Sequence, residues 1–366
     1  MILKPVDNPP NPWATTDVEY LEGETPDARL RVLEDHSRSI LSKNDSPDVP
    51  FTWSVNPYRG CFHACAYCYA RPSHEFLSLG AGTDFDRTIV VKPDAPALLR
   101  AAFDKPSWKG DVVVFSGVTD CYQPLEASYR LTRACLEVCL AYKNPVGIIT
   151  KAPLVERDVD LLADLAKQAR LSIAISIPFW DASKARAIEP YVATPQRRMR
   201  TVERLAAKGI RVGVNVAPLI PGLSDEDVPA ILAAAKDAGA SGAGTILLRL
   251  PGPVKAIFEA RVTEAFPDRA ERILNRVRDS RGGALNDPRF GHRMRGEGPY
   301  AEAVLRLFKL AGAKVGLPVS HVWMNETAST FERPAKSVSG ASGSADDCPA
   351  DTPEARPARP RQLPLF

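Results

Sequence analysis

Six short apolar runs, separated by amphipathic segments, constrain the fold of this 366-residue chain more than any other feature. The runs are rich in β-branched residues and bounded by turn residues, as expected for strands buried on both faces of a parallel sheet. They lie at residues 51–55, 111–117, 145–151, 171–177, 210–216 and 244–250.

The segments between these runs predict helices. Apolar residues recur with a 3.6-residue period at 125–143, 155–170, 195–209 and 224–239. Alternation of strands and helices at this spacing predicts a parallel α/β fold. Six strands are too few for a full eight-stranded barrel, so we expect a partial barrel or an open sheet.

The regions around this repeat differ in composition. Residues 1–50 are rich in Pro, Asp and Asn with little periodicity, which predicts an extended N-terminal arm. The barrel is expected over 51–260 and a helical, Arg-rich extension over 261–326. Residues 327–366 combine Ala, Ser, Pro and charge without an apolar period, which predicts a disordered tail.

Three cysteines, Cys61, Cys65 and Cys68, are gathered in one C-x3-C-x2-C stretch. The N-terminus lacks the apolar core of a signal peptide, and no run reaches the roughly 18 apolar residues of a membrane helix. We therefore expect a cytoplasmic protein, no membrane partner and reduced thiols. In that compartment a tight thiol group more often binds metal or does chemistry than forms disulfides.

The spacing leaves three kinds of metal site open. Structural zinc needs four ligands, and His63 is available as the fourth, but such sites usually use two separated ligand pairs. A plain electron-transfer [4Fe–4S] cluster normally takes four cysteines. Three cysteines would leave one iron open to a ligand or substrate.

The stretch resembles the radical S-adenosylmethionine (SAM) superfamily signature, C-x3-C-x-aromatic-C, with Tyr67 in the aromatic position. The resemblance implies a partial (β/α)6 barrel, a [4Fe–4S] cluster held by the three cysteines, and SAM as second cofactor. It implies that SAM is cleaved to a 5′-deoxyadenosyl radical, and that flavodoxin or ferredoxin supplies the electron. Tyr67 is then expected to pack on the adenine.

Other SAM contacts follow from the same resemblance. The "SGVTD" stretch after the second strand places Ser116, Gly117 and Thr119 near the methionine amino group. Ser176, in the fourth strand, is expected near the ribose, and Asn215, in the fifth, near the adenine. The alternative for each is an ordinary strand end or turn.

Tyr67, Tyr69 and the preceding Arg59-Gly60 are similar to the spore photoproduct lyase-like, or DNA repair photolyase-like, branch. This implies a DNA substrate, with tyrosines assisting a cysteine that returns hydrogen to a substrate radical. The chain departs from the branch at that cysteine, because the nearest one, Cys121, falls just after the second-strand motif. Cys121 is a candidate hydrogen donor, and a small buried residue is the alternative.

The Arg-rich segment 276–298 holds six arginines and three acids. Arg289, Arg293 and Arg295 alternate with aromatic rings, a pattern suited to phosphates and bases. The alternative is a solvated loop that closes the open barrel. The net charge of +3 is too small to indicate nucleic acid by itself.

The chain ends in "QLPLF", an apolar peptide after a polar tail. Such a peptide is typical of a docking motif. It resembles the bacterial sliding-clamp peptide, with matches at Gln362, Leu363, Leu365 and Phe366. The alternative is an accident of composition.

These features lead to three hypotheses. The first is a radical SAM enzyme of the repair-lyase-like kind that acts on DNA or another nucleic acid. The second is a radical SAM enzyme that modifies a protein or small molecule. The third is a non-catalytic zinc or iron–sulfur adaptor that docks on the clamp.

Overall fold

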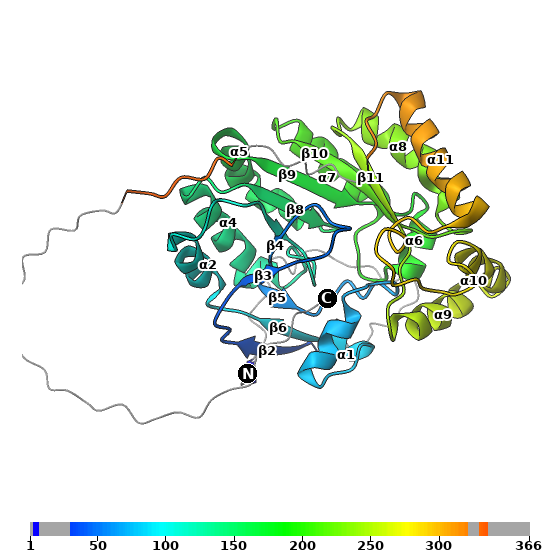
Figure 1. Cartoon of the computed structure of the whole chain (residues 1–366), viewed down its shortest axis with the longest axis horizontal. Coiled ribbons are helices and arrows are strands. Elements are labelled where there is room, and N and C mark those ends of the chain that lie inside the picture. Colours follow the sequence, from blue (N-terminus) through cyan, green and yellow to red (C-terminus); the bar gives the residue numbers. More distant parts are fainter. Residues whose placement is uncertain (1–2, 7–29, 321–328, 336–366) are drawn as a thin grey trace, which may run out of the picture.

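A seven-stranded sheet forms the centre of the molecule (Figure 1). The computed structural model describes residues 3–6, 30–320 and 329–335. The strand order is β11-β10-β9-β8-β7-β4-β3, with β3 antiparallel to β4 and the other neighbours parallel. The bounds are β3 Leu41–Lys43, β4 Trp53–Val55, β7 Val113–Phe115, β8 Val146–Thr150, β9 Leu171–Ser176, β10 Val212–Leu219 and β11 Ala243–Leu247. Each of the six predicted runs forms one parallel strand, so the predicted partial barrel is confirmed.

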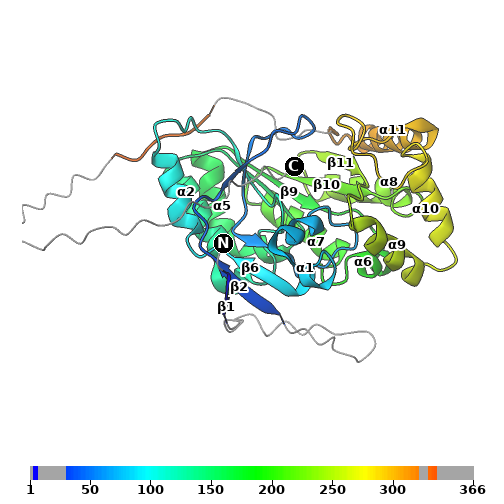
Figure 2. The same cartoon turned by 60° about the horizontal axis from the view of Figure 1, so that its bottom comes forward.

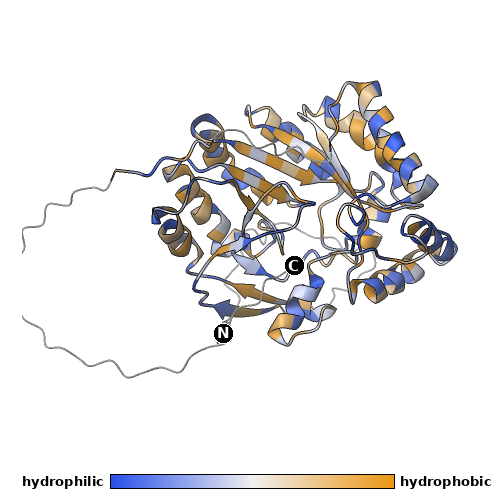
Figure 3. Cartoon of the chain, in the orientation of Figure 1, coloured by the Kyte–Doolittle hydropathy of each residue, from blue (hydrophilic) through white to orange (hydrophobic). Residues whose placement is uncertain are grey.

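Helices follow the strands and cover the sheet. α7 packs against β9 and β10, α8 packs against β10 and α11, and the strands themselves are strongly apolar (Figure 3). The α-helices are α1 Thr83–Arg87, α2 Ala95–Asp104, α3 Glu126–Tyr129, α4 Leu131–Ala141, α5 Val159–Gln168, α6 Ala182–Ile188, α7 Pro195–Ala206, α8 Val228–Asp237, α9 Val254–Ala265, α10 Ala270–Asp279 and α11 Gly298–Val315. The 3-10 helices are η1 Arg71–Leu77, η2 Pro153–Asp158 and η3 Asp225–Asp227. In the described residues no helix is both long and apolar enough to cross a membrane.

The single helix predicted over 125–143 is wrong, because the chain breaks at Arg130, whose φ is 53°. The break has a side-chain cause. The buried Glu126 carboxylate accepts hydrogen bonds from the backbone N–H groups of Thr132 and Arg133 at the start of α4. A carboxylate in this place satisfies donors that a new helix leaves open.

A second sheet, of order β1-β2-β6-β5, lies beside the first (Figure 2). Its strands are β1 Leu3–Val6, β2 Arg31–Asp35, β5 Tyr58–Arg59 and β6 Thr88–Val91. The prediction of a plain extended arm over 1–50 is therefore wrong in part, since in the described residues of this range β1, β2 and β3 pair into sheets. β5 leads directly into the cysteine stretch, so this sheet fixes where that stretch begins.

The predicted disordered tail is also wrong in part, because residues 329–335 lie on the body of the protein. The Phe331 ring stacks on Tyr142 with the centroids 6.1 Å apart. Arg333 donates hydrogen bonds to three backbone carbonyls between residues 103 and 108. An aromatic side chain and a guanidinium thus anchor a segment that has no periodic pattern.

Candidate metal and cofactor site

The loop between β5 and η1 carries the three thiols, which we call the cysteine loop (residues 60–70). Cys61 and Cys65 are each 7% exposed, and Cys68 is half-buried. Their thiols are close enough to interact electrostatically. Burial raises the pKa of all three, that of Cys61 to about 12, so thiolate formation here needs a positive partner such as a metal centre.

These thiols do not fit a single ion. Sulfur ligands of one tetrahedral zinc lie about 3.8 Å apart, given a Zn–S bond of about 2.3 Å. Within the described residues, the cysteine loop has no three ligand atoms that all lie within 4.8 Å of one another. His63, the predicted fourth zinc ligand, instead lies 3.5 Å from the carboxylate of Asp120. Three cysteines with no fourth protein ligand suit a four-iron cluster that leaves one iron open.

A buried arginine holds the loop in shape. Arg71 is 2% exposed, and its Nε donates to the carbonyl of Cys65 at 3.0 Å. The same guanidinium donates to the carbonyls of Ala81 and Gly82 and pairs with Asp86 at 2.9 Å. One side chain therefore fixes the backbone around the middle cysteine.

The loop is tied to the second-strand motif by hydrogen bonds. Thr119 Oγ1 donates to the carbonyl of Gly60 at 2.6 Å, and Gln123 Nε2 donates to the same oxygen at 3.1 Å. Tyr69 Oη donates to the carbonyl of Gly117 at 2.8 Å. Gly60 has φ 79°, and a Cβ there would lie 2.8 Å from a backbone oxygen, so only glycine fits.

The predicted SAM-contacting residues lie at the carboxyl edge of the parallel sheet. Ser116 follows β7 with the uncommon φ of 84°, and its hydroxyl accepts a hydrogen bond from Cys121 N–H at 3.0 Å. Ser176 ends β9, and Asn215 is its register partner on β10. The sheet thus brings together residues that are far apart in the sequence.

Behind the loop lies a buried charged network that the sequence did not reveal. Tyr67 Oη donates to the carboxylate of Glu189, which pairs with Arg198 at 2.6 Å. Arg198 also donates to the carbonyl of Ser176 at 2.8 Å. Burial and the Glu189 charge raise the pKa of Tyr67, so the phenol stays a proton donor. The network fixes the Tyr67 ring relative to the end of β9.

A lysine stands over the same ring. Lys151 Nζ lies 5.6 Å from the Tyr67 ring centroid, and its backbone N–H donates to Asp120 at 2.7 Å. Burial alone would lower the pKa of Lys151, but Cys65 and Glu189 raise it above its ordinary value. Lys151 therefore carries a stable positive charge beside the thiols, where it can pair with a carboxylate.

Of the three candidate hydrogen-transfer residues, Tyr67 is held in the network above, and the other two differ in exposure. Cys121 is completely buried in the main core, and burial raises its pKa well above the ordinary value. Tyr69 is 49% exposed at the edge of the cysteine loop. This placement favours packing for Cys121 and access to substrate for Tyr69.

The three arginines predicted to contact nucleic acid are not equivalent. Arg289 pairs with two carboxylates of its own segment, and Arg293 pairs with Asp48 near β3. Arg295 is exposed and has no ion-pair partner among the residues described. The first two hold the segment together, which leaves Arg295 the most available of the three.

Sequence analysis did not name four residues of this site, and only one of them could have been predicted from the sequence. Lys151 is the last residue of the third predicted strand, where a cation would reach the same sheet edge as the cysteine loop. The other three, Arg71, Glu189 and Arg198, lie in segments whose sequence has no motif that indicates a functional site. Their role depends on which segments the fold brings together.

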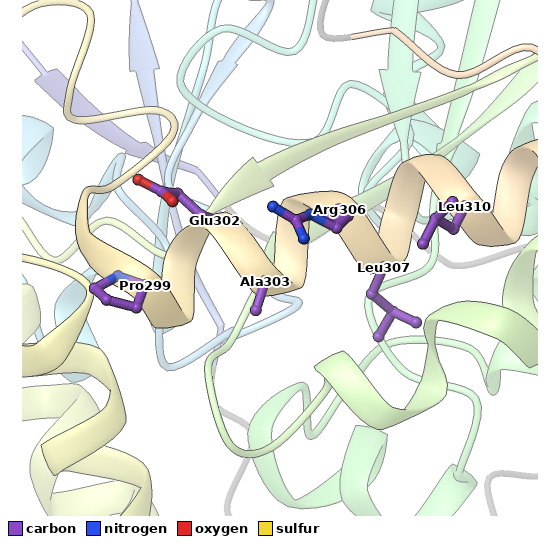
Figure 4. Close-up of a pocket in the computed structure, with 6 residues that line it drawn as sticks. All are labelled: Pro299, Glu302, Ala303, Arg306, Leu307 and Leu310. Carbon is purple, nitrogen blue, oxygen red and sulfur yellow. The ribbon is translucent and has the colours of Figure 1, made fainter.

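The predicted docking residues Gln362, Leu363, Leu365 and Phe366 lie outside the described part of the chain. A shallow groove on α11 (Figure 4) contains none of the predicted site residues. Its lining consists of Pro299, Glu302, Ala303, Arg306, Leu307 and Leu310.

The sequence matches the model of the radical SAM superfamily over residues 55–235. An uncharacterized protein of Mycobacterium tuberculosis, strain H37Rv, is 38% identical over 238 residues, which cover 64% of this chain and 70% of the relative. An uncharacterized protein of Methanocaldococcus jannaschii is 26% identical over 198 residues, 54% of this chain and 71% of that protein.

Among solved structures, the chain is similar to spore photoproduct lyase complexed with dinucleoside spore photoproduct. The TM-score is 0.57 with 16% identity, and the match covers 79% of this chain and 81% of the lyase. A variant of that lyase gives a TM-score of 0.58 with 16% identity, covering 83% and 87%. At this identity the likeness shows a shared fold.

Proposed function

Because this chain belongs to the radical SAM superfamily, we propose that it cleaves SAM reductively and uses the resulting radical on a nucleic-acid substrate. The cofactors of the family are a [4Fe–4S] cluster and SAM. When bound, the cluster passes on the electron, and SAM is the source of the hydrogen-abstracting radical. The protein's own task is to hold, orient and shield them.

One observation carries the proposal: three neighbouring thiols, too widely set for one ion, lie beside a lysine ammonium at the carboxyl edge of a parallel sheet. Cys61, Cys65 and Cys68 would hold the cluster and leave one iron without a protein ligand. Lys151 would pair with the SAM carboxylate. Ligand sites at this edge are the rule in such folds.

The remaining SAM contacts are proposed from the same edge. Ser116, Gly117 and Thr119 would face the amino group, and Gly117 and Thr119 are already tied to the cysteine loop. Ser176 would face the ribose. Asn215 and the ring of Tyr67 would contact the adenine, with that ring held in orientation by its hydroxyl.

A nucleic-acid substrate is supported by the fold shared with a lyase whose structure contains a dinucleoside photoproduct. Tyr69 matches a tyrosine of that branch and lies half exposed at the site. In the proposal Tyr69 takes part in hydrogen transfer near substrate. Cys121 stays a candidate donor, although its burial favours packing.

The proposal also includes partners and a compartment. Flavodoxin or ferredoxin would supply the electron. The terminal peptide would dock on the sliding clamp and bring the enzyme to DNA. The reducing cytoplasm suits the six described cysteines, all of which are free thiols.

The test is anaerobic reconstitution with iron and sulfide, followed by dithionite and SAM, with 5′-deoxyadenosine as the readout. Wild type and Cys65→Ala are compared without DNA, with undamaged DNA and with ultraviolet-damaged DNA. We expect product from wild type only, and more product when DNA is present.

Each result separates the hypotheses. Product that does not respond to damaged or undamaged DNA would favour a protein or small-molecule substrate. A colourless protein with bound zinc and no SAM cleavage would favour the non-catalytic adaptor and overturn the proposal.

A further inference from the structure

Three guanidinium groups gather where β11 ends, beside the C-terminal extension. Arg249 is two residues beyond β11, and Arg281 and Arg293 come from the irregular segment between α10 and α11. Arg249 interacts electrostatically with both of the others. Positive charges this close together repel one another. Each therefore needs either an anionic partner or hydrogen bonds that stabilise the fold.

Two of the three arginines make hydrogen bonds or ion pairs that stabilise the fold. Arg281 is 3% exposed and donates to the carbonyls of Leu247 and Leu248, which clamps the end of β11. Arg293 pairs with Asp48, whose other carboxylate oxygen accepts the Gly291 N–H at 2.7 Å. These contacts hold the extension against the sheet edge.

Arg249 has no ion-pair partner among the described residues, although the Asp48 carboxylate acts on its charge from beyond ion-pair distance. No carboxylate oxygen of the described residues lies within 4.0 Å of its guanidinium. Its Nε is buried without a hydrogen-bond partner, and its one hydrogen bond within the described part of the chain, 3.7 Å from Nη1 to Met294 Sδ, is to a weak acceptor. Arg249 is half-buried, and a buried Nε with an unmet donor is costly unless a ligand completes it.

The position of Arg249 connects it to the chemistry. Its charge interacts with the phenol of Tyr69, the residue after the last cluster cysteine. That phenol donates to Gly117 in the proposed SAM-amino motif. Arg249 therefore stands at the exposed side of the site, on the same sheet edge as the cysteine loop.

We propose that Arg249 is a substrate-binding residue that holds a phosphodiester oxygen of the nucleic acid next to the radical site. This rests on the proposed function and adds the group that the site recognises. Guanidinium and phosphate form paired, charge-assisted hydrogen bonds, and Arg281 adds positive potential beside Arg249, whereas the charge of Arg293 is balanced by Asp48. The SAM carboxylate is the other anion that could bind Arg249, but in the proposed function that carboxylate pairs with Lys151.

The experiment measures anaerobic binding of labelled hexadeoxythymidylate to reconstituted protein by fluorescence anisotropy. A neutral analogue with methylphosphonate linkages is run in parallel. Arg249→Gln is compared with Arg272→Gln, which removes the same charge from an exposed position on α10. Iron content, melting temperature and SAM affinity are measured for every variant.

We expect Arg249→Gln to weaken binding of the charged oligonucleotide by about tenfold or more. The neutral analogue should bind equally to wild type and variant. Arg272→Gln should change binding by less than about threefold, as for an exposed charge. Arg249→Lys, which keeps the charge but loses the planar fork, should lose about threefold or more, and it serves as the second variant if Arg249→Gln fails to retain iron.

Unchanged oligonucleotide binding in Arg249→Gln, or an equal loss with the neutral analogue, would overturn the inference and leave the proposed function standing. A loss confined to SAM affinity would overturn it by assigning Arg249 to the cofactor. Wild type that binds neither oligonucleotide would remove the nucleic-acid substrate and this inference together.

Discussion

The phenol of Tyr67 donates a hydrogen bond to the buried carboxylate of Glu189, which lies 122 residues further along the chain. Glu189 in turn pairs with Arg198, and the two side chains are 0% and 1% exposed respectively. The aromatic residue of the cysteine motif is therefore oriented by a charge pair whose members lie at the end of α6 and in α7. This relationship makes the orientation of the Tyr67 ring depend on residues outside the motif.

Breaking this network is expected to have unequal effects. Glu189→Gln leaves Arg198 buried without a counter-charge and should cost about 3–5 kcal/mol of unfolding free energy. Tyr67→Phe keeps the ring and removes one hydrogen bond to a charged acceptor, which should cost about 1.5–3 kcal/mol. Urea unfolding of both variants and of the double variant measures the coupling. Additive losses would contradict a direct interaction.

Lys151 is expected to govern SAM affinity. Lys151→Met removes the cation beside Cys65 and should weaken SAM binding by about tenfold or more, because a charge-assisted hydrogen bond is lost. Lys167→Met, at a solvent-exposed side chain on α5, is the control. Equilibrium dialysis of SAM against both reconstituted variants measures the effect. Equal affinities would exclude Lys151 as a SAM ligand.

Arg71 is expected to be required for cluster retention. Arg71→Leu leaves the carbonyl of Cys65 and the Asp86 carboxylate without their donor, which should cost about 3–5 kcal/mol. Iron content after desalting and the urea midpoint should both fall. The exposed Arg272→Gln should keep both values within error of wild type. Full iron content in Arg71→Leu would show that the loop holds its shape without this side chain.

The Asp48–Arg293 pair is expected to stabilise the extension over a defined pH range. Burial alone would raise the pKa of Asp48, but the Gly291 N–H and Arg293 lower it below its ordinary value. A lowered folded-state pKa gives stability that is present above the unfolded pKa of about 3.9 and lost as the pH falls through the folded value.

Asp48→Asn should therefore cost about 1.5–3 kcal/mol at pH 7, and the difference from wild type should stay constant down to pH 5. Urea unfolding at several pH values checks this. A difference that already shrinks between pH 7 and pH 5 would contradict the lowered pKa. Hydrogen exchange in the peptide around Gly291 should increase in the same variant.

Local patterns were sufficient for the parts of the fold that depend on neighbouring residues. Continuous β-branched runs and 3.6-residue stripes predicted the six parallel strands and most of the helices. The compact C-x3-C-x2-C stretch predicted the metal-binding loop and its family. Such patterns record only which side chains a strand or helix buries, and burial is decided largely by residue type.

Tertiary structure decided the rest, because those interactions join segments that no local period relates. β6 and the strands of residues 1–50 are too short and irregular to predict. β2 pairs with β6, which also pairs with β5 at the start of the cysteine loop, and β3 pairs with β4 in the main sheet. Glu189 reaches Tyr67, and Asp48 reaches Arg293, across 122 and 245 residues. The sequence by itself determined the strands and the thiols. Parallel strands place their carboxyl ends at one edge, so the packing of the sheet determined which charges surround the thiols.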